Sequence, residues 1–218
     1  VQRGSHDDNR IDRNIVGKLV RSHLGIAGDC AIASINNRKL APEIFDLNVS
    51  VSRIGEPELG DRVIKSGRTT DVTYGIVQRI HVITRINYDE AGWREIGCFE
   101  IGPDPEHPAP NGEISMGGDS GSVWLFVDQD EPTDMMLGLH FAGEVGDEPE
   151  HALACYAESV FEKLNISPTK TLEIVREDAA GIGYAEKFLG VSIEMPSSAT
   201  DEVKNDLLEV GGLTVIDY

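Results

Sequence analysis

Short apolar runs separated by turn-forming residues recur from about residue 14 to residue 166. The runs are rich in Val and Ile, and clusters of Gly, Pro, Asn and Asp lie between them. This pattern is typical of an all-β sandwich or barrel, because β-branched side chains pack well on a pleated sheet and the intervening residues favour turns. The expected strands cover residues 14–22, 30–35, 61–67, 74–86, 95–102, 122–128 and 135–143.

Two longer stretches extend this pattern. Residues 74–86 alternate well enough for a half-buried strand, and their length predicts that this strand bends or pairs along its whole length. Residues 152–166 instead carry apolar side chains at helical spacing, and Pro168 follows them. We therefore expect one helix to close the β-rich part, with its apolar positions at Ala152, Cys155, Tyr156, Val160, Phe161 and Leu164.

The chain divides into three parts by composition. Residues 1–13 form a polar, flexible N-terminal segment, residues 14–166 form the β-rich domain, and residues 167–218 form an appended segment or linker. Within the domain, residues 102–118 are too rich in Pro and Gly for regular structure, and long irregular segments are usually functional or disordered. The chain stops on a strand-like run, so we expect either that the natural chain continues or that a strand ends it.

Length and charge exclude several classes of protein. A chain of 218 residues can bury a substantial core. Its 38 acidic and 19 basic residues give a net charge of -19, which argues against direct nucleic-acid binding, because that needs clustered Lys and Arg. The sequence has no apolar run of about 18 residues, and its N-terminus lacks the apolar part of a signal peptide. We therefore expect a soluble protein with no membrane partner.

The cysteines point away from disulfides and metals. Cys30, Cys98 and Cys155 are odd in number, widely spaced and without CxxC spacing, so neither a disulfide framework nor a zinc site is favoured. The expected location is a reducing cytoplasm. We expect no metal and no cofactor.

The stretch "MGGDSGSVW", residues 116–124, carries the most specific chemistry. A serine hydroxyl is a weak nucleophile that needs a base, a group to orient that base, and donors for the developing oxyanion. The flanking glycines allow backbone angles that other residues avoid, and they let a substrate carbonyl approach closely. The N–H groups of Gly118 and Ser120 can then point at one spot, where negative charge develops.

Two other interpretations of this stretch stay open. A Gly-Asp-Ser turn between two strands is common and needs no chemistry. An anion-binding glycine loop is a weaker alternative, because no Lys or Arg lies near residues 116–122 and no helix starts there. The neighbours favour catalysis: a long loop precedes the stretch, and the apolar strand "SVWLFV" follows it.

The motifs "KSGRTT" at 65–70, "GDSGS" at 118–122 and "GLHFAG" at 138–143 follow one another before the closing helix. In this order the chain resembles the trypsin-like, chymotrypsin-fold serine proteases, specifically bacterial members, over residues 14–166. The resemblance implies an all-β fold of two β-barrels, with the first barrel incomplete in this chain, followed by a C-terminal helix and the appended segment.

The resemblance also assigns roles to single residues. Ser120 matches the nucleophile, and Gly118 and Ser120 match the oxyanion donors. The base of the specificity pocket falls on Ile114, which is apolar, so no strong preference for Lys or Arg is expected. Ser122 stands where many members have a second glycine. The residues that match the substrate-binding strand are Phe141, Ala142 and Gly143.

The segment "GDCAIASI" matches the family's stretch in which the orienting aspartate precedes an alternating apolar strand. This match makes Asp29 the expected partner of the base, where it would fix the tautomer of a histidine and stabilise the imidazolium. An aspartate that merely opens a strand after a glycine turn is the alternative. Asp61, in "GDRVIKSG", is the possible substitute.

The base histidine has no clear match. In the family order it precedes the aspartate by several strands. His6 lies in the polar N-terminal segment, and His23 is so close to Asp29 that we expect it to be a surface loop residue. We expect the first strands and the base to lie upstream of Val1, in a part removed by cloning or by proteolytic processing. If that part stays associated with the chain, it would restore the site.

The other histidines have structural explanations. The sequence predicts that His81 lies within a strand, that His107 lies in the Pro-rich loop and that His151 opens the closing helix. His140 lies close to the substrate-binding strand and could line the site, but a packed or solvent-facing strand histidine is the simpler interpretation.

The tail carries a second, shorter resemblance. The segments "GYAEKFLGVSIEMP" and "GGLTVIDY" resemble the joining region of bacterial proteins that fuse a trypsin-like protease to a non-specific DNA/RNA endonuclease. This resemblance implies a downstream nuclease domain as a partner that the protease cuts or gates. The chain itself carries no nuclease motif.

Two classes of function therefore compete. The first is a serine endopeptidase, or its C-terminal processed portion, that cleaves protein or peptide substrates through an acyl-enzyme on Ser120. The second is a catalytically inactive module with the protease fold that serves as a binding or regulatory domain. Covalent labelling of Ser120 distinguishes them.

Overall fold

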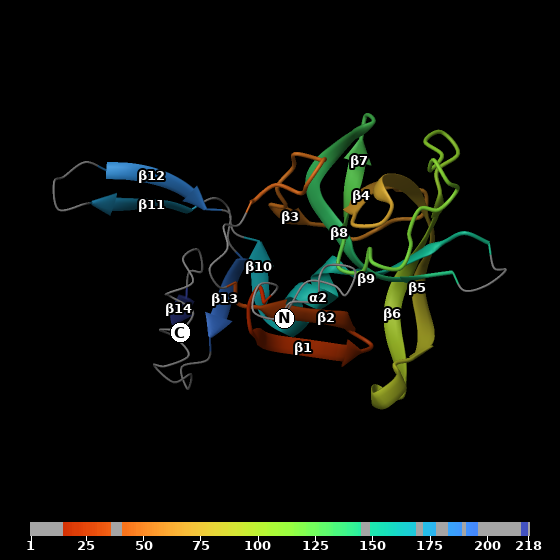
Figure 1. Cartoon of the computed structure of the whole chain (residues 1–218), viewed down its shortest axis with the longest axis horizontal. Coiled ribbons are helices and arrows are strands. Elements are labelled where there is room, and N and C mark those ends of the chain that lie inside the picture. Colours follow the sequence, from red (N-terminus) through yellow and green to blue (C-terminus); the bar gives the residue numbers. More distant parts are fainter. Residues whose placement is uncertain are drawn as a thin grey trace.

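The computed structural model describes residues 15–35, 41–144 and 149–168, together with the backbone of four short strands between residues 172 and 217 (Figure 1). The described elements are β1 (Leu19–Gly25), β2 (Gly28–Ala33), β3 (Arg53–Ile54), β4 (Arg62–Gly67), β5 (Asp71–Asn87), η1 (Asp89–Ala91), β6 (Trp93–Pro103), β7 (Val123–Asp128), β8 (Glu131–Gly143), β9 (Ala152–Tyr156), α2 (Ala157–Leu164), β10 (Ile166–Pro168), β11 (Leu172–Glu177), β12 (Gly183–Phe188), β13 (Val191–Met195) and β14 (Val215–Asp217).

A closed barrel forms the centre of the molecule. The largest sheet has the strand order β3-β8-β7-β4-β5-β6-β9, and β9 also pairs with β8. This additional pairing, from Gly138↔Tyr156 to Gly143↔Ala152, closes six of the strands into a barrel, with β3 as an extra strand on its edge. The prediction of an all-β fold is confirmed, and each of the seven expected strands overlaps an observed one.

Strand β5 bends, as its length and alternation predict. Its pairing with β6 shifts register between Val77 and Arg79 and again between Arg79 and Val82. His81 within this interval has a φ of 56°, which is rare for a residue with a side chain. The extra residues of these bulges let one long hairpin both line the barrel and extend beyond it.

The hairpin of β1 and β2 is separate from the barrel sheet. It is a two-stranded antiparallel sheet with pairs from Leu19↔Ala33 to Gly25↔Gly28. A two-stranded hairpin is barely stable alone, so its stability comes from packing on other elements. The Arg21 guanidinium donates to the carbonyl of Leu164 at the end of α2, and the N–H of Gly97 on β6 donates to the carbonyl of Ile26 at 3.1 Å.

The expected helix over residues 152–166 is only partly correct. The structure forms a strand over Ala152–Tyr156 and begins the helix at Ala157. Ala154 pairs with Phe99 on β6 and with His140 on β8, so this segment supplies the strand that closes the barrel. Pairing on both sides overrides the helical spacing, which continues correctly through α2 up to Asn165, whose left-handed conformation caps the helix.

Alternating side chains of the barrel strands form two core clusters. The inner cluster draws on all six barrel strands and includes Trp124, Phe99 and Ile101, each 0% exposed. The outer cluster lies between the barrel wall, α2 and the β1–β2 hairpin, and it includes Leu125, Cys155 and Phe161. The barrel wall is therefore buried on both of its faces in this region.

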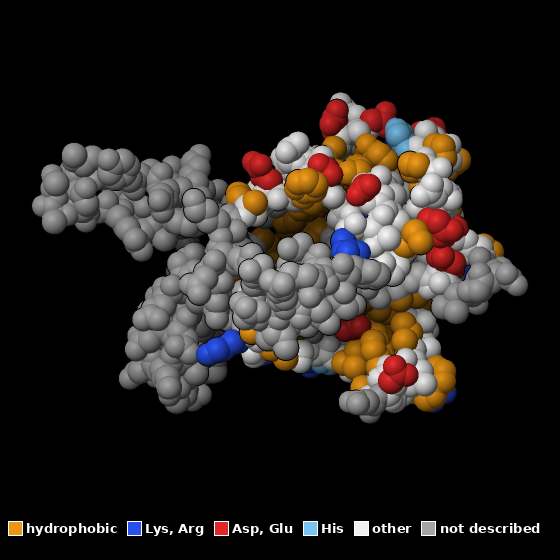
Figure 2. Space-filling model, viewed as in Figure 1, with side chains coloured by type: hydrophobic (Ala, Val, Ile, Leu, Met, Phe, Trp, Pro, Cys, Tyr) orange, Lys and Arg blue, Asp and Glu red, His pale blue; other side chains and the backbone are white. Residues whose placement is uncertain are grey.

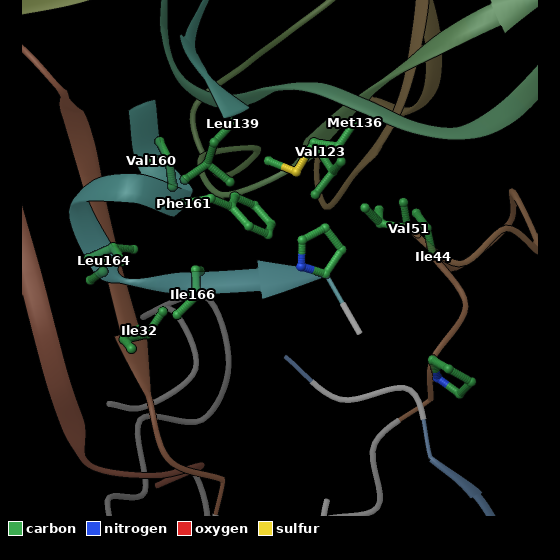
Figure 3. Close-up of a pocket in the computed structure, with 13 residues that line it drawn as sticks. Ile32, Ile44, Val51, Val123, Met136, Leu139, Val160, Phe161, Leu164 and Ile166 are labelled. Carbon is green, nitrogen blue, oxygen red and sulfur yellow. The ribbon is translucent and has the colours of Figure 1, made fainter. Parts of the chain in front are cut away.

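The outer cluster contains a cavity of about 290 Å³. Figure 3 shows side chains of β2, β7, β8, α2 and β10 around it. Every residue that lines it is apolar, so the cavity offers no group for acid-base chemistry.

On the face shown in Figure 2, acidic side chains spread over the barrel and outnumber basic ones, in keeping with the net charge of -19. No helix among the described residues has the length and apolarity needed to cross a membrane.

Candidate active site

Ser120 lies at the end of the irregular loop, shortly before β7. The residue is exposed, whereas Asp119 beside it is only 1% exposed. Gly118 and Gly121 have φ values of +110° and +90°, which side chains disfavour. A Cβ added at Gly118 would also lie 2.5 Å from Oγ1 of Thr69. The loop thus needs its glycines in order to present Ser120 at the surface.

The backbone N–H groups of this loop fall into two sets. Those of Asp119 and Gly121 each donate to a backbone carbonyl, at 3.0 and 2.8 Å. Those of Gly117, Gly118 and Ser120 make no hydrogen bond within the described part of the chain. These residues are exposed, so their N–H groups can bond to solvent or to a ligand oxygen. Gly118 and Ser120 carry the two groups that the sequence assigns to the oxyanion hole.

Asp119 anchors the loop to the turn between β4 and β5. Its carboxylate accepts hydrogen bonds from the backbone N–H groups of Thr69, Thr70 and Met116, at 2.7, 3.3 and 3.0 Å. The Thr70 hydroxyl donates at 2.6 Å, and Nζ of Lys65 donates at 3.2 Å. Lys65, Thr69 and Thr70 of the "KSGRTT" motif therefore surround one carboxylate.

The pair of Lys65 and Asp119 is fully buried. Burial by itself would raise the pKa of Asp119, but the Thr70 hydroxyl, the N–H of Thr69 and the Lys65 ammonium lower it to about 2. Burial lowers the pKa of Lys65, and the Asp119 carboxylate opposes that shift. A buried charge pair with this many donors fixes geometry, because removing either partner would leave the other charge uncompensated.

Two basic residues stand closer to the loop than the sequence suggests. No Lys or Arg is near residues 116–122 along the chain, yet Lys65 contacts Asp119 directly. Nη1 of Arg68 lies 3.6 Å from the position that a Cβ at Gly118 would take. The expectation that no basic side chain lies near residues 116–122 is therefore wrong in the folded protein, because the turn after β4 folds over the loop.

Strand β8 brings the expected substrate-binding residues to the loop. The N–H of Gly121 donates to the carbonyl of His140, and the N–H of His140 donates to the carbonyl of Ser122 at 2.9 Å. The residues that follow on β8 are half-buried. They are Phe141, Ala142 and Gly143. A Cβ at Gly143 would lie 2.8 Å from Oγ of Ser115, so the end of β8 packs against the residue that directly precedes Met116.

Ile114, the expected base of the specificity pocket, is 0% exposed and belongs to the inner core cluster. Its carbonyl accepts a hydrogen bond from the Thr73 hydroxyl at 2.8 Å, and its N–H donates to Oε1 of Glu150 at 2.7 Å. The backbone of Ile114, rather than its side chain, makes the polar contacts at this end of the loop.

Three carboxylates gather beside Ile114. Each of Glu113, Glu144 and Glu150 offers an oxygen within 4.8 Å of the others, a spacing that could hold a cation. Burial, together with the other two carboxylates, raises the pKa of Glu150 to about 7. No motif in the sequence indicates this cluster, because the barrel closure at β9 brings its members together.

Asp29 lies at the start of β2, on the other side of β8 and β9 from the loop. Its N–H donates to Sγ of Cys155 at 3.2 Å, and Cys155 pairs with Leu139, the neighbour of His140 on β8. The hydroxyl of Tyr88 donates to its Oδ2 at 2.8 Å. Two strands thus link Asp29 to the loop that carries Ser120.

Asp61, the possible substitute for Asp29, has a different role. Its Oδ2 accepts a hydrogen bond from the N–H of Glu58 at 2.8 Å, which closes the turn before β4. None of its contacts among the described residues reaches the loop that carries Ser120, so its placement is that of a turn residue.

No described histidine hydrogen-bonds to Ser120 or Asp29. His140 is 4% exposed and lies edge-on to Trp124, and burial together with Lys65 lowers its pKa to about 4. His140 is therefore a neutral, packed strand histidine at pH 7, as the simpler interpretation predicts.

The structure corrects the predicted positions of two histidines. His23 is a half-buried residue of β1 and not a surface loop residue, because β1 runs on to Gly25. His151 precedes β9 and does not open a helix. His81 lies in β5 and His107 in the loop after β6, as expected. His6 lies outside the described residues.

The closed barrel, the β1–β2 hairpin and the C-terminal helix together form a chymotrypsin-like fold. No family model matches the chain, and no characterised protein matches it in sequence. Among solved structures, the chain is similar to a glutamic acid-specific serine protease described as using a histidine triad in substrate binding, at 20% identity and a TM-score of 0.50 over 67% of this chain and 70% of the other.

Two further solved structures are similar. Cellulomonas bogoriensis chymotrypsin is 16% identical, with a TM-score of 0.49 over 69% of this chain and 73% of the other. Thermobifida fusca protease A is 20% identical, with a TM-score of 0.49 over 67% of this chain and 70% of the other. At such low identity the likeness shows the fold alone.

Proposed function

We propose that this chain acts as a serine endopeptidase with Ser120 as its nucleophile. The observation that carries the proposal is the pair of unbonded N–H groups at Gly118 and Ser120, on a loop held rigid by Asp119. Donors that are fixed before the substrate arrives stabilise the oxyanion without a reorganisation cost.

In the proposed reaction, Oγ of Ser120 attacks the carbonyl carbon of the scissile peptide bond, and its proton passes to a histidine base. The carbonyl oxygen becomes an oxyanion that accepts the N–H groups of Gly118 and Ser120. The C–N bond then breaks, and the base gives its proton to the leaving amine. Water attacks the resulting ester in the same way and restores the Ser120 hydroxyl.

Asp29 is the orienting carboxylate in this proposal. It would accept the second N–H of the base histidine and stabilise the imidazolium that forms during attack. The base itself is a histidine supplied from outside the described residues. Its expected effect is large, because the oxyanion hole alone gives only residual catalysis.

A fluorophosphonate probe tests the proposal on the full-length protein. We expect covalent labelling that Ser120→Ala abolishes. The matched control is Ser122→Ala, because Ser122 lies in the same loop and its hydroxyl donates to the Asp119 carbonyl at 2.5 Å. Labelling that survives in Ser120→Ala, or its absence from the full-length protein, would contradict the proposal.

The second candidate is a binding module with the protease fold and no catalysis. The absence of a histidine bonded to Ser120 or Asp29 among the described residues favours it. In this case the free N–H groups of Gly118 and Ser120 would hold a carbonyl or carboxylate of a partner without bond cleavage. Peptide binding that is equal in the parent protein and in Ser120→Ala, without labelling, is its signature.

We also propose that the substrate includes a fused or associated effector domain. The support is the resemblance of residues 183–196 and 211–218 to the joining region of protease–endonuclease fusions. Co-expression with the downstream part of the parent gene should give a cleaved product that Ser120→Ala does not give. An uncut and fully active effector would contradict it.

A further inference from the structure

The carboxylate of Asp29 has one side-chain partner in the described structure. The Tyr88 hydroxyl donates to Oδ2 at 2.8 Å, while Oδ1 accepts no hydrogen bond from any described residue. A hydrogen bond to a charged acceptor is stronger than one between neutral groups, and it restricts rotation of the carboxylate. Oδ1 is left available to a second donor.

Tyr88 reaches Asp29 from a distant part of the chain. It lies at the tip of the β5–β6 hairpin, whose far end lies beside the end of β1 in Figure 1. The tip is a closed turn, because the N–H of Tyr88 donates to the carbonyl of Gly92 at 3.1 Å and its own carbonyl accepts the N–H of Ala91 at 3.0 Å. The Tyr88 ring also packs on the outer core cluster.

A second contact fixes this hairpin against the Asp29 hairpin. The N–H of Gly97 on β6 donates to the carbonyl of Ile26, in the turn between β1 and β2. A Cβ at Gly97 would lie 2.5 Å from that same oxygen, so the two backbones touch. The Tyr88 hydroxyl is therefore held at Asp29 by packing of the backbone and not by a flexible side chain alone.

We infer that Tyr88 is a positioning residue that orients the Asp29 carboxylate toward the base. The inference rests on the proposed function. Tyr88 occupies Oδ2 and leaves Oδ1 for the imidazole N–H, so the carboxylate presents one defined oxygen to the histidine. Asp29 is in turn fixed to the strands beside the nucleophile loop through Cys155.

The surroundings of Asp29 contain no competing charge among its described electrostatic partners, which are Tyr88, Cys155 and Cys30. Burial raises the pKa of all three groups, so each stays neutral at pH 7. Tyr88 remains a donor over the whole working range, and any change in the titration of the base reports on the Asp29 carboxylate.

The alternative is that the bond merely ties two hairpins together. Tyr88→Phe keeps the ring and removes only the donor. If Tyr88 positions Asp29, the loss should slow acylation of Ser120 about tenfold, because a hydrogen bond to a charged group is worth about that factor. A carboxylate that is no longer held toward the imidazole stabilises the imidazolium less, so the pH midpoint of acylation should fall by about half a unit.

The matched control is Tyr156→Phe. The Tyr156 hydroxyl accepts the N–H of His81 at 2.6 Å, so its loss loosens the same β5–β6 hairpin without touching Asp29. The measurement is the second-order rate constant of labelling by diisopropyl fluorophosphate from pH 5 to 9, on full-length protein below its thermal midpoint. The folded state of each variant is checked by circular dichroism.

Slower labelling with a lowered midpoint in Tyr88→Phe alone supports the inference. Equal rate and midpoint in Tyr88→Phe and the parent protein, or slowing without a shift in both tyrosine variants, would overturn it while leaving the proposed function intact. No labelling of the parent protein would overturn the proposed function and this inference with it.

Discussion

The loop that carries Ser120 and the β1–β2 hairpin hold the two halves of the candidate site in different ways. The Asp119 carboxylate beside Ser120 is buried and receives donors from the turn after β4, from Lys65 and from its own loop. The Asp29 carboxylate receives one side-chain donor, from the tip of a hairpin. The loop is thus built into the barrel, whereas the placement of Asp29 depends on two hairpins that dock on one another.

This difference predicts that the contacts of Asp119 determine the stability of the fold, whereas those of Asp29 determine the orientation of its carboxylate. Changes around Asp119 should damage the fold and the site together, because the network lies inside the barrel end. Changes around the Asp29 carboxylate should alter the chemistry more than the fold, because its one side-chain donor, Tyr88, is only partly buried. The following variants test this separation, from the largest expected effect to the smallest.

Asp119→Asn should have the largest effect. It leaves the Lys65 ammonium without a counter-charge at a fully buried site, so the free energy of unfolding should fall by about 3 to 5 kcal/mol in urea titrations. The control is Asp128→Asn, an exposed residue at the end of β7, which should change it by less than about 0.5 kcal/mol. Similar small losses for both variants would show that the pair does not anchor the loop.

Adding Lys65→Met to Asp119→Asn should recover part of that loss. Removing both charges ends the cost of an unpaired buried ammonium, and coupling between the two sites of about 1 to 3 kcal/mol is expected from a double-mutant cycle. The Asp119 pKa of about 2 also implies that the pair stabilises above pH 3.8 and that this stabilisation is lost as the pH falls through 2. Strict additivity of the two changes would contradict a direct interaction.

Gly118→Ala should cost about 1 to 3 kcal/mol, because the residue has a φ of +110° and a Cβ would lie 2.5 Å from Thr69. Gly117→Ala is the neighbour control, since nothing lies within 4 Å of its Cβ position. Thermal unfolding of both variants measures the difference. Equal midpoints would mean that the backbone at Gly118 is not the one described.

Glu150→Gln should give the smallest effect, visible as a pH dependence. The folded pKa of Glu150 is about 7 and its ordinary value is 4.5, so its protonated form stabilises the fold below pH 4.5 and this contribution is lost as the pH rises through 7. Glu150→Gln should therefore gain stability relative to the parent between pH 5 and pH 8, by about 1 kcal/mol after solvent screening. Glu162→Gln, on the exposed face of α2, should show no such trend.

The features that the sequence predicts correctly depend on residues close together along the chain. The glycines and Ser120 of "GDSGS" specify a turn with positive φ angles, and the alternating runs specify seven of the strands. Strand β9 was not predicted, because its residues are nearly all buried. Full burial removes the alternation that marks a strand and leaves a pattern that also fits a helix.

The partners of the site residues could not be predicted for a different reason. Lys65 with Asp119, Tyr88 with Asp29, and Glu113 with Glu144 and Glu150 are far apart along the chain, and they meet only when the strands and hairpins pack together. The motif "KSGRTT" supported the family resemblance but did not indicate the carboxylate that it contacts. Tyr88 carried no signal, because a single tyrosine after a strand has many possible partners.

The central claim is that Ser120 is a nucleophile facing an oxyanion hole made by the N–H groups of Gly118 and Ser120. The most direct measurement is a crystal structure of the full-length protein after reaction with diisopropyl fluorophosphate. We predict a phosphorus–Oγ bond at Ser120 and a phosphoryl oxygen about 2.7 to 3.1 Å from both nitrogens. An unmodified Ser120, or an adduct whose oxygen contacts neither nitrogen, would contradict the account.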